Sequence, residues 1–345
     1  MNQYDIVIKN GTIIDGTGLP RYRADIGIRA GRIARIGRIT DTGGAEVLDA
    51  EGLIVAPGFV DLHTHYDAQI HWDPYCTISG WHGVTSVAIG NCGFGFAPAR
   101  PAVRERLFRM MTRTEQVPYE TMVAGVGLDW DWESMPEWMD HLERVPKGVN
   151  VLNYVPLNPL LVHVLGLEGA KSGRQATPDE LAEMKRLIHE AMDAGMMGWS
   201  CQRFGKNSMQ ADYDGTPMPT DMMHGDTLLA FAELLGERGE GFIEMSAAPM
   251  AREKWERIAE LSGAPIIYQA LPPSRYLLDM HADLLAWFER CREKGLRIYG
   301  QGITQNPPLV FTLDYWDLWA PVWNEFAGPD IDRETKLRNL ADPAV

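Results

Sequence analysis

Cysteine, basic residues and long apolar runs are all scarce in this sequence. The four cysteines are widely spaced and form no Cys-x-x-Cys pair, which argues against a disulfide scaffold and fits a reducing compartment. There is no run of about 18 apolar residues, and the N-terminus lacks a basic start followed by an apolar core. We therefore expect a cytoplasmic protein without a signal peptide and without a membrane partner.

The shortage of positive charge limits the possible partners. Lys and Arg number 32 against 47 Asp and Glu, which gives a net charge of −15 at pH 7. A chain with this charge repels polyanions, so we expect no nucleic-acid partner. Hydrophobic residues at 45% and charged residues at 23% are typical of a globular protein, and 345 residues give room for one large domain plus a small one.

The first part of the chain, residues 4–56, is a series of short apolar runs separated by turns. The run Ile6-Val7-Ile8 is followed by Asn10-Gly11, which is a hairpin signal. Apolar and polar residues then alternate in segments 24–28 and 32–36. This pattern predicts a small antiparallel β unit that is half buried on one face.

After Pro57-Gly58 the pattern changes to strand-like runs that alternate with amphipathic helices. The clearest helix is 177–194, where Thr177 and Glu180 form a capping box. Such alternation predicts parallel strands joined by helical crossovers, in a (β/α)₈ barrel with one strand missing or in an open doubly wound sheet. The nucleotide-binding form of the open sheet has little support, because no Gly-x-Gly-x-x-Gly follows the first strand. The expected strands are 59–65, 85–90, 149–155, 196–201, 241–247, 265–271 and 296–302, and the other expected helices are 226–238, 252–261 and 279–294.

Two histidines lie at the end of the first of these strands. On a strand, residues two apart point to the same face, so His63 and His65 project together, about 7 Å apart at their Cα atoms. Two neutral imidazoles at this separation can converge on one divalent metal ion. Because the chain has nine histidines, a chance pair of surface or packed histidines is the alternative.

A cysteine between glycines follows the second strand. Cys92 lies in Gly90-Asn91-Cys92-Gly93, at the end of an apolar run. This position brings its thiol to the same mouth as the two histidines, and a thiolate beside a divalent metal binds well. A buried structural cysteine is the alternative interpretation.

These motifs resemble those of the N-acyl-D-amino-acid deacylases (D-aminoacylases) of the amidohydrolase superfamily. The similarity is dense over about the first 100 residues and weaker over 180–198. It rests on the segments 10–18, 48–52 and 83–86, and above all on Pro57-Gly58-Phe59-Val60-Asp61-Leu62-His63-Thr64-His65 and Gly90-Asn91-Cys92-Gly93.

The resemblance implies a fold, a reaction and a metal. It implies an α/β (β/α)₈ TIM barrel of the metal-dependent hydrolase type over residues 58–345, with a small β-sandwich-like unit over residues 1–57. It implies zinc, as one or two divalent ions, with His63 and His65 as ligands and Cys92 in place of a carboxylated lysine. The implied reaction is metal-dependent hydrolysis of a linear amide, most simply the deacylation of an N-acyl-D-amino acid. The implied partner is therefore a small-molecule substrate, while the oligomeric state is open.

The sequence also departs from the family pattern. Glu244 and Gln269 stand where the family has histidines, and the family's strand-eight aspartate has no counterpart. We therefore expect an incomplete barrel whose C-terminal part is missing, with Glu244 as the candidate catalytic carboxylate. One alternative is a catalytically impaired fragment or a metal- or ligand-binding remnant of such an enzyme. Another is a cyclic-amide hydrolase of the hydantoinase type, which the absence of a strand-four lysine disfavours.

Overall fold

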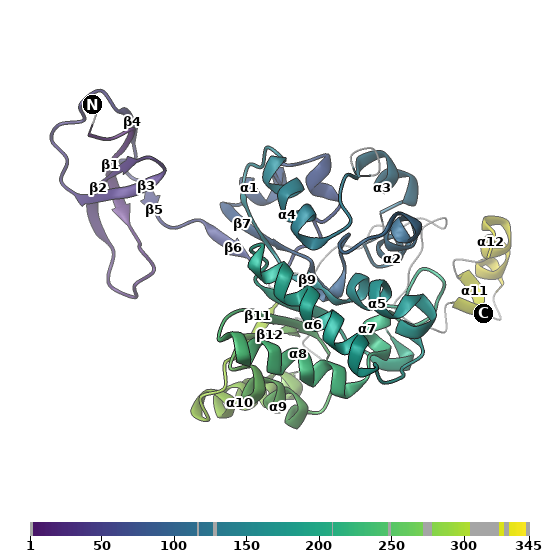
Figure 1. Ribbon diagram of the computed structural model, residues 1–345. Helices are drawn as coiled ribbons and strands as arrows, with labels where there is room; N and C mark the ends of the chain where they lie inside the picture. Colours follow the sequence, from purple (N-terminus) through teal and green to yellow (C-terminus); the bar gives the residue numbers. More distant parts are fainter. Residues whose placement is uncertain are drawn as a thin grey trace. The chain divides into compact units, whose positions relative to one another are not determined.

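The computed structural model describes residues 3–115, 117–126, 130–208, 210–247, 250–271, 278–303, 324–327 and 331–342. The chain divides into two compact units, Met1–Phe59 and Val60–Val345. Figure 1 shows the strands of the first unit in purple and the helices and strands of the second in blue, green and yellow. We describe each unit by itself.

The first unit is a single five-stranded sheet of mixed direction. Its strands are β1 (Ile6–Ile13), β2 (Tyr22–Arg29), β3 (Arg32–Gly37), β4 (Glu46–Asp49) and β5 (Ile54–Val55). The order is β3-β2-β1-β4, and β5 also pairs with β1. The β1–β2 and β2–β3 pairs are antiparallel as expected, whereas β4 and β5 both run parallel to β1.

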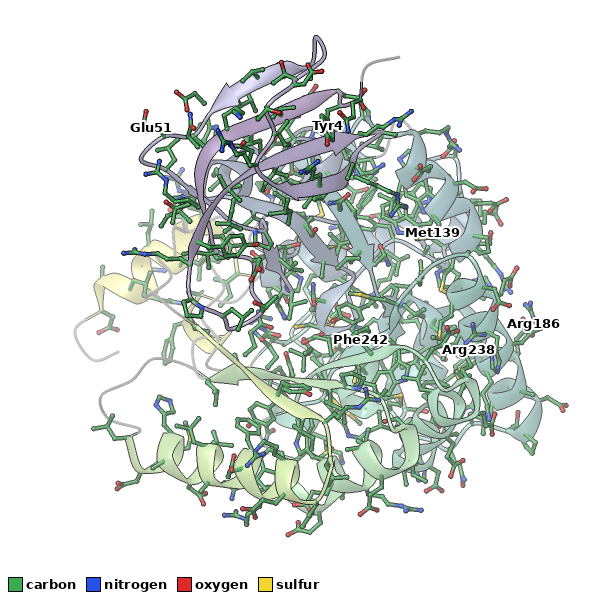
Figure 2. All side chains as sticks on the ribbon, turned by 90° about the vertical axis from the view of Figure 1, so that its left-hand side faces the viewer. Tyr4, Glu51, Met139, Arg186, Arg238 and Phe242 are labelled. Carbon is green, nitrogen blue, oxygen red and sulfur yellow. The ribbon has the colours of Figure 1, made fainter. Side chains whose placement is uncertain are left out.

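The predicted hairpin at Asn10-Gly11 is wrong, because both residues lie inside β1. Asn10 has a left-handed backbone with φ 62°, and the pairing register with β2 shifts between Ile8 and Gly11. The Asn10 backbone N–H donates to Asp25 (3.0 Å) and its side chain donates to Asp49 (2.9 Å). These bonds hold a β-bulge, so the strand bends here and continues. Val7 of this strand packs in a small buried cluster with Tyr4, which Figure 2 labels.

Strands and helices alternate in the second unit, as the sequence predicts. One sheet has the order β6-β7-β8, and another has the order β13-β12-β11-β10-β9. Every pair in the second sheet is parallel, and so is β7–β8. The strands are β6 (Phe59–Asp61), β7 (Val84–Ile89), β8 (Asn150–Asn153), β9 (Val155–Pro156), β10 (Gly198–Gln202), β11 (Phe242–Ser246), β12 (Ile266–Leu271) and β13 (Ile298–Gly302).

In the described part of the chain the two sheets meet around Tyr154 and do not close into a barrel. The Tyr154 N–H donates to the Ile89 carbonyl (3.0 Å), and the Met197 N–H donates to the Asn153 carbonyl (2.9 Å). Among the described residues no pairing joins β6 to β13. The α/β alternation is therefore confirmed, but the structure does not confirm the predicted TIM barrel.

Helices connect the parallel strands and cover them. The predicted capping box is present at the start of α6, where Thr177 and Glu180 bond reciprocally. The indole N–H of Trp199 on β10 donates to the Phe231 carbonyl on α8, so this helix packs against the sheet (3.2 Å). The Arg186 side chain is exposed on the outer surface, whereas Arg238 is mostly covered and pairs with Asp193 and Glu240; Figure 2 labels both arginines. The α-helices are α1 (Thr77–Trp81), α2 (Arg104–Glu115), α3 (Tyr119–Gly125), α4 (Met135–Arg144), α5 (Leu157–Lys171), α6 (Pro178–Asp193), α7 (Pro219–Met222), α8 (Gly225–Arg238), α9 (Arg252–Ser262), α10 (Leu278–Glu293), α11 (Asn324–Ala327) and α12 (Arg333–Ala341).

None of the helices in the described part of the chain combines the length and the apolar character that crossing a bilayer requires.

Candidate metal centre

His63 and His65 lie just beyond the carboxyl end of β6. The strand ends at Asp61, earlier than the sequence predicts, because the Asp61 carboxylate accepts the His63 N–H and forms a turn (3.1 Å). The buried Thr64 between the histidines bonds the Ala88 carbonyl on β7 through its N–H (3.1 Å) and its hydroxyl (2.7 Å). Thr64 therefore fixes the loop to the next strand while both histidines project together.

Cys92 lies in a short 3₁₀ turn, Asn91–Gly93, that follows β7. Its backbone is left-handed (φ 54°, ψ 14°), which is uncommon for a residue with a side chain. The Asn91 side chain donates to the Thr64 carbonyl and to the Ala88 carbonyl, both at 2.8 Å. The turn that carries the cysteine is thereby tied to the loop that carries the histidines.

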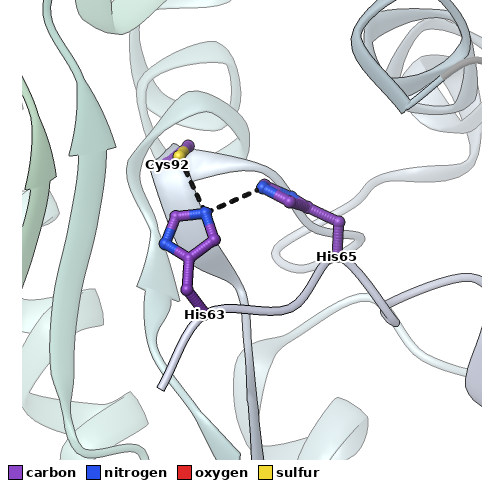
Figure 3. Close-up of side chains that lie close together, drawn as sticks. All are labelled: His63, His65 and Cys92. Carbon is purple, nitrogen blue, oxygen red and sulfur yellow. Dashed lines mark hydrogen bonds between the residues drawn. The ribbon is translucent and has the colours of Figure 1, made fainter. Parts of the chain in front are cut away.

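The structure brings the three predicted ligand side chains together (Figure 3). The Nε2 atoms of His63 and His65 are 3.1 Å apart, and the Cys92 Sγ is 3.5 Å from the His63 Nε2. All three atoms lie within 4.8 Å of one another. Tetrahedral zinc with Zn–N bonds of about 2.0 Å and Zn–S bonds of about 2.3 Å places its ligand atoms about 3.3–3.6 Å apart. The two shorter spacings, 3.1 and 3.5 Å, are close to these values, whereas the widest spacing within the cluster, up to 4.8 Å, is longer than a tetrahedral ion sets.

A carboxylate lies behind each imidazole. The His63 Nδ1 is 3.5 Å from the Glu244 Oε1, and the His65 Nδ1 is 3.3 Å from the Glu115 Oε1. A carboxylate at Nδ1 favours the tautomer with its proton there, which leaves the Nε2 lone pair for a metal. Neither Nδ1 makes a hydrogen bond, so the two carboxylates lie beside the imidazoles at ion-pair distance only.

The protonation states of the histidines, the two glutamates and the cysteine are also compatible with a bound cation. Burial keeps the pKa of His63 well below its usual range and lowers that of His65 to about 4, so both imidazoles are neutral at pH 7. Burial raises the pKa of Glu244 and of Glu115 to about 8. Burial and the nearby Glu244 also raise the pKa of the Cys92 thiol. A divalent ion among these groups would supply the positive charge that favours the thiolate and the carboxylates.

Glu244, the candidate catalytic carboxylate, is completely buried on β11. Its Oε2 accepts the Cys92 N–H at 2.6 Å, while its Oε1 faces His63. Both oxygens are therefore engaged with the residues that carry the donor atoms. Gln269, the other departure from the family pattern, lies on β12 and lines a neighbouring cavity.

Sequence reasoning missed two further buried carboxylates near the donors. Glu115 comes from the last residue of α2, and its pKa is raised by burial and by the nearby Asp67. Burial raises the pKa of Asp67 to about 7, although its Oδ1 accepts the Gly90 N–H (2.9 Å). A carboxylate in the last turn opposes the helix dipole, but α6 and α10 also end on acidic residues, so no local signal singles out Glu115 in the sequence.

Comparisons with known sequences find similar proteins. A family model described as the amidohydrolase family matches residues 46–328, and a model of the urease alpha-subunit N-terminal domain matches residues 1–58. An uncharacterized protein of Mycobacterium tuberculosis is 38% identical over 200 residues, which is 57% of this chain and 32% of that protein. An N-acyl-D-aspartate deacylase and a D-aminoacylase of Alcaligenes xylosoxydans are each 34% identical, over 59% and 58% of this chain and over 37% and 38% of their own lengths.

Solved structures share the fold. A D-aminoacylase crystal structure has a TM-score of 0.66 at 23% identity, covering 86% of this chain and 57% of that one. The N-acyl-D-glutamate deacylase of Bordetella bronchiseptica, solved with zinc and a phosphonate inhibitor, has a TM-score of 0.64 at 26% identity with the same coverage. A D-aminoacylase of similar fold has a binuclear metal centre.

The extent of these matches decides what they establish. This chain spans less than two fifths of the length of the curated relatives named above. The family model nevertheless covers most of the chain, including all three donor residues. The chain therefore belongs to the amidohydrolase family.

Proposed function

We propose that this protein is a metal-dependent hydrolase of linear amides, and that it deacylates N-acyl-D-amino acids. The single observation that carries the proposal is the convergence of His63, His65 and Cys92 at the carboxyl ends of adjacent strands. The similarity to D-aminoacylase and to N-acyl-D-aspartate deacylase supports the amide substrate. The proposed metal is zinc, because two imidazoles and a thiolate are ligands that zinc accepts well.

The protein's own residues hold and orient the site. His63 and His65 would bind the ion through Nε2, with their Nδ1 atoms directed at Glu244 and Glu115. A divalent ion held there supplies a Lewis acid that polarises the scissile carbonyl and acidifies water. Cys92 is buried and the two histidines are only partly exposed, which limits the access of bulk water and strengthens electrostatic interactions inside the site.

Glu244 has a positioning role in this proposal, in place of the catalytic role that the sequence suggests. A general base needs an oxygen within about 3 Å of the proton that it removes. Both Glu244 oxygens instead face the Cys92 N–H and the His63 ring. Glu244 therefore orients two of the proposed ligands at once.

The proposal is tested by hydrolysis. The purified chain loaded with zinc is expected to release the free amino acid from N-acetyl-D-methionine, and a chelator is expected to stop this release until zinc is restored. N-acetyl-L-methionine is the control for chirality. If neither enantiomer is hydrolysed although zinc is bound in a 1:1 ratio, the chain binds a metal without this activity and the proposal fails.

Glu115 gives a second, independent prediction. Replacing Glu115 with Gln removes the charge behind His65 and keeps an oxygen of similar position. We expect the zinc affinity to fall about 10–100-fold, the usual effect of losing an outer carboxylate. Titration against a chelator of known affinity measures the change. Glu105→Gln, on the exposed face of the same helix, is the matched control and should bind like the native chain. An unchanged affinity in Glu115→Gln would show that Glu115 has no part in metal binding.

A further inference from the structure

A cavity of about 500 Å³ opens beside the proposed metal ligands. His63, Cys92 and Ser246 line one part of it, and α9, β12 and α10 supply most of the remaining wall. This volume lies within the range of about 300–1,000 Å³ that is usual for small-molecule sites. The cavity therefore has both the position and the size to hold a substrate of the proposed reaction.

Large apolar and aromatic side chains make up the wall away from the donors. Met280, Leu284 and Trp287 follow one another at spacings of four and three residues, so they share one face of α10. The Tyr268 ring lies between two tryptophan rings, with centroids 4.8 Å from Trp255 and 5.9 Å from Trp287. Burying an apolar group against such a wall stabilises the complex, whereas burying an unpaired charge there destabilises it.

Arg252 is the only Lys, Arg, Asp or Glu among the described residues that line the cavity. Its guanidinium lies 5.5 Å from the centre of the Trp287 ring, on the aromatic wall. Two of its nitrogens donate to Asp283, which is not part of the lining. A guanidinium has five N–H donors, so Arg252 has donors left for one further anion.

We infer that this cavity selects N-acyl amino acids that carry a single carboxylate and a bulky apolar side chain, with Arg252 as the carboxylate anchor. The inference rests on the proposed function. An aspartate or glutamate substrate would bring a second carboxylate into the aromatic wall, where no described lining residue supplies a second permanent positive charge. This protein therefore differs in side-chain preference from its relative named for N-acyl-D-aspartate.

Binding tests the inference without depending on turnover. Trp255 and Trp287 line the cavity, so intrinsic fluorescence follows its occupation. We expect N-acetyl-D-phenylalanine to bind at least about 10-fold more tightly than N-acetyl-D-glutamate or the uncharged N-acetyl-D-phenylalaninamide. Replacing Arg252 with Met should weaken binding of the acid about 10–100-fold and leave the amide unchanged, while Arg252→Lys should restore part of the loss. Arg257→Met, on the exposed face of α9, is the matched control.

The outcomes separate this inference from the proposed function. If the protein shows the expected binding preferences but hydrolyses none of these amides, the cavity assignment is supported and only the proposed activity is contradicted. Zinc-dependent hydrolysis with equal or tighter binding of N-acetyl-D-glutamate would overturn the inference and keep the activity. Binding of the acid that is unchanged in Arg252→Met, or no binding of any compound at about 10 mM, would also overturn the inference.

Discussion

The chain with both His63 and His65 replaced by alanine is expected to retain almost no zinc, against about one ion per native chain. The two Nε2 atoms supply two of the three convergent donors, and their separation of 3.1 Å lets both bind the same ion. One remaining thiol is a poor site, because burial raises the pKa of Cys92 and keeps it protonated when no cation is near. Elemental analysis after dialysis against zinc-free buffer measures the content.

The exposed His82 provides the control for this experiment. The His82→Ala chain should hold as much zinc as the native chain, because His82 lies outside the donor cluster. Circular dichroism should show that the double variant keeps its helices, since neither histidine lies in a helix. A full equivalent of zinc in a folded double variant would contradict the proposed ligand set.

Replacing Cys92 with Ser is expected to lower the zinc affinity by more than about 10²-fold, since even the loss of an outer partner costs about 10–100-fold. The thiol becomes a thiolate beside a metal ion, whereas a serine hydroxyl is a far weaker zinc ligand. The substitution leaves the left-handed backbone of residue 92 unchanged, so the comparison isolates the sulfur atom. Competition with a chelator gives the two affinities.

Cys76 is a close control for this change. It is fully buried and also has a left-handed backbone, with φ 46°. Cys76→Ser therefore reproduces the loss of a buried thiol in a similar conformation, away from the donor cluster. Native zinc affinity in Cys92→Ser, or an equal loss in both variants, would mean that Cys92 is a packing residue.

Much of the second unit could be predicted from periodicity. The capping box at Thr177 and Glu180, followed by an apolar stripe, defined α6 to within one residue at each end. The strands β7, β11 and β12 lie where the apolar runs predict them, because buried parallel strands must be apolar on both faces. The first strand ends earlier than expected, since the Asp61 side chain turns the backbone before His63.

Long-range contacts could not be predicted in this way. Asn10-Gly11 has the local composition of a hairpin, but Asp25 and Asp49, both distant in sequence, hold it as a bulge. Glu115 reaches His65 from a helix 50 residues further along the chain. Periodicity describes one element at a time, so it predicts neither of these contacts nor whether β6 and β13 pair.

The turn that carries Cys92 also restricts how the site can change by evolution. A Cβ atom at Gly90 would lie 2.5 Å from the Tyr154 carbonyl oxygen, and one at Gly93 would lie 3.2 Å from the Cys201 Cα. A side chain at Gly90 would therefore clash with the backbone, and one at Gly93 would be tightly packed on a strained left-handed backbone (φ 80°), so both positions favour glycine over a replacement ligand. Glu244 and Ser246 on β11 already contact the Cys92 sulfur, at 3.9 and 3.2 Å. A lineage that exchanges this metal for another would accordingly accumulate its substitutions on β11 and leave the glycines of the turn fixed.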